Sequence, residues 1–244
     1  MYIQDILKID TNLMPLYITA ATLGFVHTVF GPDHYLPFVV MSRARKWSLT
    51  KTGIITFLCG LGHIMSSVVI GVIGIIFGIG VMKLEGLEAS RGNLAGWALM
   101  VFGFTYLVWG IHRAIKNKPH KHLHVHLDSP DHSHIHSHTT EHTHVHNQKG
   151  KANITPWVLF TIFILGPCEP LIPILMYPAA KNSIIGILGV TVIFGAVTIL
   201  TMFSIVMISC LGIDLIPLRR LERYTHAIAG VTILLCGIAI QLGL

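Results

Sequence analysis

The stretch Gly-Pro-Asp-His-Tyr-Leu-Pro at residues 31–37 places a helix break and an aspartate inside a long apolar run. A similar stretch, Gly-Pro-Cys-Glu-Pro-Leu-Ile-Pro, occupies residues 166–173 of a second apolar run. Proline removes a backbone donor and clashes with the preceding turn, so each stretch should interrupt a helix. Ionisable side chains such as Asp33 and Glu169 are costly within a membrane and commonly mark an ion or substrate path. The two stretches therefore indicate where function should be sought.

The composition of the 244-residue chain excludes an ordinary soluble domain, because 52% of the residues are hydrophobic and only 11% are charged. The mean hydropathy is +0.68. Apolar runs that can cross a bilayer core of about 30 Å as helices lie near residues 13–41, 52–81, 93–112, 155–180, 184–212 and 225–244. We therefore expect an all-α integral membrane protein with about six transmembrane helices, of which the first and fourth are broken by proline.

Lysine and arginine are concentrated in the loops after the first, third and fifth predicted helices, which hold thirteen of the seventeen. These residues retain loops on the cytoplasmic side. We therefore expect a multi-pass protein of the cell membrane with both termini extracytoplasmic and the long middle loop cytoplasmic. The net charge of +6 then reflects topology and contact with the lipid bilayer, and no nucleic-acid partner is expected.

The chain contains an internal repeat of three predicted helices. An offset of 135 residues aligns residues 31–32 with 166–167, and an offset of 134 continues the alignment into the third helix. Because each half has an odd number of helices, the halves should be inverted in the membrane, as in many secondary transporters whose binding sites lie at broken helices. We divide the chain into a membrane repeat at 1–115, a disordered histidine-rich cytoplasmic loop at 116–154 and a second membrane repeat at 155–244.

Three histidines accompany Asp33 in the predicted membrane interior. His27 and His34 lie seven residues apart, which is two helical turns, and His63 lies near the middle of the second predicted helix. Imidazole nitrogens together with a carboxylate oxygen suit borderline divalent ions such as Ni²⁺, Co²⁺ or Zn²⁺. We therefore expect these four side chains to be the ligands of a metal ion.

The second break adds two candidates. Glu169, together with Asp33, would offset the two charges of a dication in a medium of low dielectric constant. We expect Glu169 to be a charge partner, a proton-coupling group or a further ligand. Cys168 beside it is either a small buried residue or a lesser metal ligand.

The segment His-Thr-Val-Phe-Gly-Pro-Asp-His at residues 27–34 resembles the second-helix signature of the nickel/cobalt transporter (NicO/NiCoT) superfamily, and most closely that of its UreH-like branch. The resemblance implies a metal permease and places the metal-binding signature on His27, Asp33 and His34. The large uptake permeases separate the histidine from the Asp-His pair by four residues, whereas five intervene here. Nickel and cobalt exporters carry His-Xaa-Xaa-Glu-Pro-Gly-His instead.

We therefore expect a transporter of nickel or cobalt that works by alternating access, with uptake slightly favoured over export. The transported ion is the substrate, and no resident cofactor is expected. Metallochaperones or nickel-enzyme maturation proteins are candidate partners of such a permease.

The middle loop is rich in histidine at alternate positions. Its density of imidazoles predicts a weak, multivalent site that collects, buffers or senses cytoplasmic metal. The eleven histidines of this auxiliary site are His120, His122, His124, His126, His132, His134, His136, His138, His142, His144 and His146.

Two other classes of protein, membrane metalloenzymes and metal sensors or storage proteins, share some of these features. Membrane metalloenzymes also combine several helices with many histidines, but the sequence has no His-Glu-Xaa-Xaa-His motif, and we do not expect an enzyme. A metal sensor or storage protein would need a membrane anchor only. Six spans and a duplication exceed that need, so a permease remains the preferred interpretation.

Overall fold

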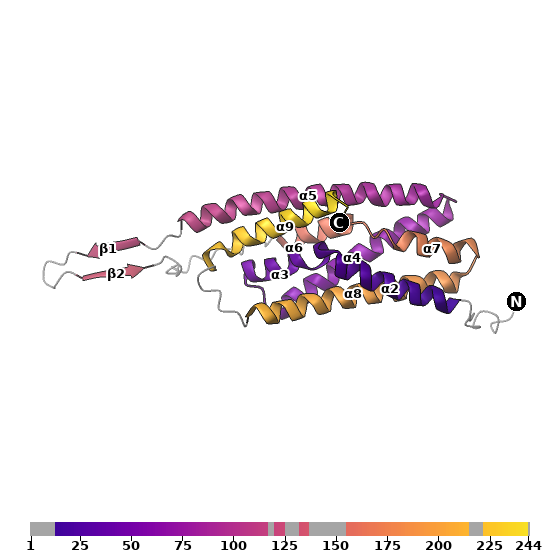
Figure 1. Ribbon diagram of the computed structural model, residues 1–244, viewed down its shortest axis with the longest axis horizontal. Coiled ribbons are helices and arrows are strands. Elements are labelled where there is room, and N and C mark those ends of the chain that lie inside the picture. Colours follow the sequence, from indigo (N-terminus) through magenta and orange to yellow (C-terminus); the bar gives the residue numbers. More distant parts are fainter. Residues whose placement is uncertain (1–12, 117–119, 125–131, 137–154, 215–221, 244) are drawn as a thin grey trace, which may run out of the picture.

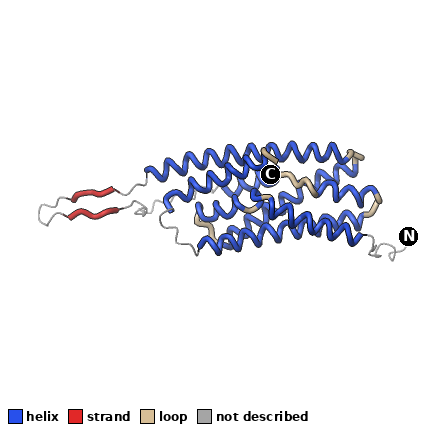
Figure 2. Tube along the Cα trace, viewed as in Figure 1, coloured by secondary structure: helices blue, strands red, loops and turns tan. Residues whose placement is uncertain are grey.

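The computed structural model describes residues 13–116, 120–124, 132–136, 155–214 and 222–243. These residues form an elongated bundle of helices with a short β-ribbon projecting from one end (Figure 1). Helices make up nearly all of the described chain (Figure 2). The expectation of a helical fold is confirmed.

The first half consists of a broken helix followed by two long helices. Helix α2 (Met14–Phe30) is followed by the 3-10 turn η2 (Pro32–His34) and by α3 (Leu36–Arg45). The long helices are α4 (Leu49–Ile76) and α5 (Val81–Lys116). Ser48 caps the start of α4, because its side chain accepts a hydrogen bond from the backbone N–H of Lys51.

The second half has the same order of elements. Two short helices, α6 (Thr155–Leu165) and α7 (Leu171–Ala180), flank the break at residues 166–170. The long helix α8 (Ile184–Asp214) follows, and then the turn η3 (Glu222–Tyr224) and helix α9 (Thr225–Gln241).

The expected count of six membrane-spanning helices is not confirmed. Within the described ranges, four helical segments are long and apolar enough to cross a membrane, namely Leu49–Ile76, Val81–Lys116, Ile184–Ile213 and Glu222–Gln241. The first broken helix, bent by 82°, makes a fifth candidate when its two parts are counted as one span. Helices α6 and α7 have 11 and 10 residues, so each is only about 15 Å long and falls short of a bilayer core.

The bend of the first helix has a local cause. The N–H of Gly31 donates to the carbonyl of His27, which completes α2, and Pro32 has no N–H with which to continue it. The N–H of His34 then donates to the carbonyl of Gly31 at 3.0 Å and closes the 3-10 turn. The Gly-Pro pair therefore redirects the chain just before the Asp-His pair.

Helix α5 begins earlier than the apolar run at 93–112 suggested. Its 36 residues start at Val81, so the polar segment before the run is helical and not a loop. This places Glu88 and Arg91, three residues apart, on the same face of α5. Arg91 was expected in an extracytoplasmic loop.

The last helices of the two halves, α5 and α9, pack closely through glycine. A Cβ atom on Gly103 would lie 2.4 Å from the backbone nitrogen of Leu234, and one on Gly230 would lie 2.4 Å from the backbone nitrogen of Leu107. Only a residue without Cβ fits at these positions. Close backbone approach at small residues is the usual means by which helices associate in lipid.

Large apolar side chains cover much of the outer surface. Phe30, Phe77, Met82 and Ile208 are each at least 70% exposed. Exposed apolar area of this extent is unfavourable in water and suits contact with lipid. The surface and the long apolar helices are thus compatible with a membrane protein.

Ten residues of the histidine-rich loop form the ribbon, in strands β1 (His120–His124) and β2 (His132–His136). The strands are antiparallel, and their register pairs His120 with His136, His122 with His134 and His124 with His132. The sequence predicted no regular structure here. The other loop histidines, His126, His138, His142, His144 and His146, lie outside the described residues, as do the N-terminal residues 1–12.

Candidate metal centre

The structure brings His27, His34 and His63 together from three elements. His27 lies in the last turn of α2, His34 in η2 and His63 in the middle of α4. The ring centroids of His27 and His34 are 4.6 Å apart, those of His34 and His63 are 5.0 Å apart, and those of His27 and His63 are 6.3 Å apart. The bend at Gly31 makes this possible, because it turns the Asp-His pair back toward α4.

The Nε2 atoms of the three histidines are buried and have no hydrogen-bond partner among the described residues. Such atoms are rare, since a buried polar group without a partner costs about 1–3 kcal/mol. Three histidines with such atoms in one group are therefore suited to bind a common ligand.

The other ring nitrogens show how two of these histidines can act as ligands. His34 Nδ1 lies 3.1 Å from the carbonyl oxygen of Gly31, and His63 Nδ1 lies 3.3 Å from that of Phe163. A carbonyl only accepts, so each Nδ1 carries the proton. In the neutral ring, Nε2 then holds a free lone pair, which is the arrangement that metal-binding histidines usually have.

The spacing of the donor atoms fits a metal ion after a small adjustment. Ligand atoms of the three residues all lie within 4.8 Å of one another. Imidazole nitrogens bind zinc-sized ions at about 2.0–2.1 Å, which puts neighbouring nitrogens of a tetrahedral site about 3.4 Å apart. Side-chain movements of about 1 Å would close the site.

A small cavity beside the histidines has room for little more than one water molecule. Its volume is about 10 Å³, close to the minimum for a single water. Asp33, His34, His63 and Gly166 are part of its wall. The break of the second half therefore reaches the cavity through Gly166.

Asp33 takes a different place from the one expected. Its Oδ1 atom lies 3.3 Å from Nδ1 of His34, and its side chain is 22% exposed. The histidines alone form the group of mutually close donor atoms found in the described part of the chain. Asp33 thus lies beside His34 and outside the group of donor atoms that are within 4.8 Å of one another, and its role as a ligand stays a prediction.

The two candidates from the second break are not brought into the histidine group. The side chain of Glu169 is exposed. Cys168 is fully buried, and its backbone N–H donates to the carboxylate of Glu88 at 3.0 Å. Glu169 was expected near the metal because it is the carboxylate of the second break, but the turn after Pro167 leaves Glu169 exposed and buries Cys168.

The buried charged residues of α5 were not among the candidates predicted from the sequence. Glu88 is fully buried and pairs with Arg91, whose guanidinium also contacts Ser66 and the carbonyl of Ile164. Their Glu-Xaa-Xaa-Arg spacing was a usable signal, and the offset of 134 residues aligns Glu88 with Glu222.

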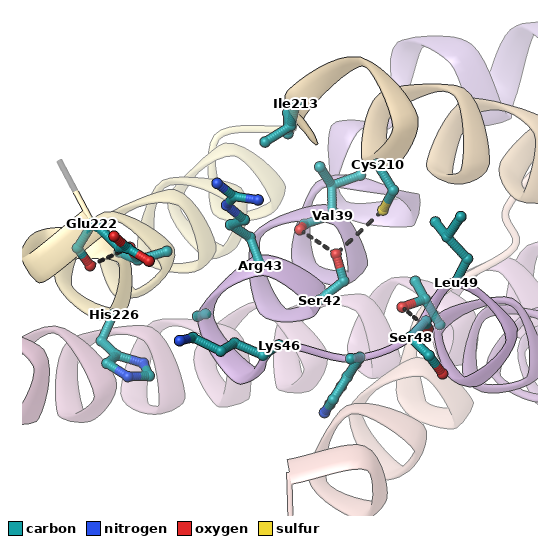
Figure 3. A pocket seen from close by; sticks show the side chains of 14 residues that line it. Val39, Ser42, Arg43, Lys46, Ser48, Leu49, Cys210, Ile213, Glu222 and His226 are labelled. Carbon is teal, nitrogen blue, oxygen red and sulfur yellow. Dashed lines mark hydrogen bonds between the residues drawn. The ribbon is translucent and has the colours of Figure 1, made fainter. Parts of the chain in front are cut away.

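A larger cavity of about 410 Å³ lies at another place in the bundle, among α3, the start of α4, the end of α8 and the start of α9 (Figure 3). Its wall includes Arg43, Lys46, Glu222 and His226. The hydroxyl of Ser42 and the thiol of Cys210 are 3.2 Å apart there. Both polar and apolar side chains line this cavity.

Comparisons of this chain with protein-family models, with curated proteins and with solved structures find no match. The functional argument therefore depends on the site itself.

Proposed function

We propose that this protein is a membrane permease for divalent transition-metal ions, with Ni²⁺ and Co²⁺ as the preferred substrates. The observation that carries the proposal is a group of three histidines beside a proline break between apolar helices. Their ligand atoms lie within 4.8 Å of one another, and their buried Nε2 atoms have no hydrogen-bond partner among the described residues. Imidazole ligands favour ions of borderline softness over Mg²⁺ and Ca²⁺, which prefer oxygen.

The position of the centre favours transport over catalysis. The three histidines belong to a broken helix and to a long apolar helix, and broken helices surround the binding sites of many secondary transporters. Such breaks are tolerated in a membrane only where protein or a polar cavity satisfies the free backbone groups. A metalloenzyme would also need room for a substrate beside the metal, whereas the cavity measures about 10 Å³.

The contacts between helices support an inverted repeat. Helix α2 packs against α8 of the other half, and α6 in turn packs against α4. The third helices, α5 and α9, pack against each other and run in opposite directions (Figure 1). An exchange of this kind is expected of two units related by a two-fold axis in the membrane plane, which is the basis of alternating access.

In this proposal, the ion gives up water as the three imidazoles replace it. Asp33 holds the His34 ring in its binding tautomer and adds one negative charge near the dication. Relative movement of the two halves would then expose the centre to one face and later to the other.

The histidine-rich ribbon is proposed to gather metal on the cytoplasmic side. It lies at the end of the bundle opposite the N-terminal end of α2 (Figure 1), and its strand register pairs six histidines across the two strands. Deletion of residues 120–146 should lower the number of bound metal ions and leave transport through the bundle in place. Complete loss of flux at normal expression would contradict this auxiliary role.

The direct test is metal flux into proteoliposomes, with Ni²⁺, Co²⁺ and Zn²⁺ compared. We expect His34→Ala to abolish saturable flux. His112→Ala, which changes an exposed histidine of α5, should behave as the unmodified protein. Unchanged flux in His34→Ala would exclude this site from transport, and metal binding without flux would favour a sensor.

Export is the second candidate direction, since a cytoplasmic histidine ribbon can supply ions for expulsion as readily as it can trap incoming ions. Flux measured in vesicles of known orientation separates the two directions. Metal-dependent turnover of lipid or peptide would instead support a membrane enzyme.

A further inference from the structure

Glu88 is a fully buried carboxylate that the proposed metal centre does not use. One of its oxygens accepts hydrogen bonds from the hydroxyl of Ser67 and from the backbone N–H of Cys168, each at 3.0 Å, and the other pairs with Arg91. All of these partners donate hydrogen bonds to the carboxylate oxygens. A buried ion pair is weak evidence for stability as such, and its surroundings indicate another role.

Arg91 supplies partners that the second broken helix lacks. Its Nη2 atom donates to the carbonyl of Ile164 at 2.6 Å and lies 3.4 Å from that of Gly166. These carbonyls are at the end of α6, where no following turn exists to bond them. The pair therefore binds both sides of the break. Arg91 donates to the carbonyls before Pro167, and Glu88 accepts from the N–H of Cys168 after it.

The held segment touches the metal centre. A Cβ atom on Gly166 would lie 3.1 Å from Nδ1 of His63, and the carbonyl of Phe163 is the partner of that same nitrogen. A shift of the break would therefore alter the orientation of His63. Arg91 also reaches Ser66, three residues after His63, at 2.6 Å.

The corresponding position in the other half has different surroundings. Glu222, which the offset of 134 residues aligns with Glu88, is exposed and lines the cavity of about 410 Å³ (Figure 3). Glu88 is buried against the second break, whereas Glu222 faces a polar cavity. We infer that these are the closed side and the open side that alternating access requires at any moment.

We propose that Glu88 and Arg91 form a gating ion pair, which holds the second broken helix closed over the metal centre and separates when the ion passes on that side. The inference rests on the proposed transport function. Both residues act through the break and through His63, so they are positioning residues and not ligands.

Cys168 provides a reporter for this gate. Its side chain is fully buried next to Glu88, so a thiol reagent should reach it only when the break moves. The reporter protein keeps Cys168 and carries serine at the other three cysteines, Cys59, Cys210 and Cys236. The rate of Cys168 alkylation by a small maleimide is measured in proteoliposomes with and without saturating Co²⁺.

We expect Co²⁺ to change the alkylation rate at least threefold in the reporter protein. Glu88→Gln, which keeps the size of the side chain, should raise the rate at least tenfold and abolish its response to Co²⁺. Glu85→Gln is the matched control, since Glu85 lies one turn earlier on α5 and is exposed; its rate should equal that of the reporter protein. Arg91→Gln provides a second variant, and the thermal unfolding midpoint of each protein establishes that it is folded.

Equal alkylation in Glu88→Gln and in the reporter protein would overturn the gate. A second result would also overturn the gate. If Glu88→Gln speeds alkylation but Co²⁺ does not change the alkylation rate of the reporter protein, the pair has only a structural role. Failure of the proposed function is seen separately, as an absence of Co²⁺ binding that depends on His34. Normal binding of that kind with an unresponsive Cys168 overturns the gating pair alone.

Discussion

Nδ1 of His63 lies 3.3 Å from the carbonyl oxygen of Phe163, so a side chain of the first half is oriented by the backbone of the second. The contact joins the middle of α4 to the last turn of α6. The orientation of His63 in the proposed metal centre therefore depends on the relative position of the two halves. This is the physical link between binding and movement in the proposed mechanism.

Replacement of His63 should remove one of the three ligands. We expect His63→Ala to lower the affinity for Co²⁺ by more than about 100-fold, since loss of a partner that only orients a ligand already costs about 10–100-fold. Isothermal titration of the detergent-solubilised protein measures this, with His112→Ala as the control. Equal affinities of His63→Ala and His112→Ala for Co²⁺ would show that His63 is not a ligand.

Replacement of Asp33 should have a smaller effect than loss of a histidine. Asp33→Asn removes the negative charge but keeps a side-chain oxygen near His34 Nδ1, so we expect the affinity to fall by about 10–100-fold. The same titration compares it with His34→Ala. An equally severe loss in both variants would make Asp33 a direct ligand.

Gly31 leaves the space that the His34 ring occupies. A Cβ atom there would lie 2.5 Å from His34 Nδ1 and 3.0 Å from the carbonyl oxygen of His27. We expect Gly31→Ala to displace the ring and to weaken Co²⁺ binding more than tenfold, with an overpacking cost of about 1–3 kcal/mol. Gly86→Ala is the control, because no atom lies within 4 Å of the added group. Binding unchanged by Gly31→Ala would argue against this geometry.

Close approach of α5 and α9 depends on Gly103. We expect Gly103→Val to lower the free energy of unfolding by at least about 1–3 kcal/mol, because the added atoms meet the backbone of Leu234 and not a flexible side chain. Gly86→Ala on the same helix should be neutral or stabilising, since alanine exceeds glycine in helix propensity by about 1 kcal/mol. Thermal unfolding in detergent compares the two variants, and equal midpoints would contradict the packing.

The sequence identified the features that arise from local chemistry. Proline lacks an N–H in any surroundings, so the break at Pro32 after α2 was predictable. The structure has the break at this position. His27, His34 and His63 stand out because imidazoles are rare in apolar runs, and the structure brings them together. Their grouping supports the expected metal site.

The sequence was less informative where three-dimensional packing decides. Glu169 aligns with His34, but side-chain direction after a proline break depends on the neighbouring helices, and Glu169 is exposed. Glu88 and Arg91 precede the apolar run, so hydropathy placed them outside the helix that contains them. Their Glu-Xaa-Xaa-Arg spacing is a signal of the pair, but its burial follows from the packing of α4, α5 and the second break.

The most direct test of the central claim is X-ray absorption spectroscopy of one equivalent of Co²⁺ bound to the protein without residues 120–146, so that loop histidines do not contribute. We predict three imidazole nitrogens at about 2.0–2.1 Å, the distance typical of zinc-bound histidine, and the loss of one of them in His63→Ala. A shell of oxygen atoms alone, or a spectrum that His63→Ala leaves unchanged, would contradict the account.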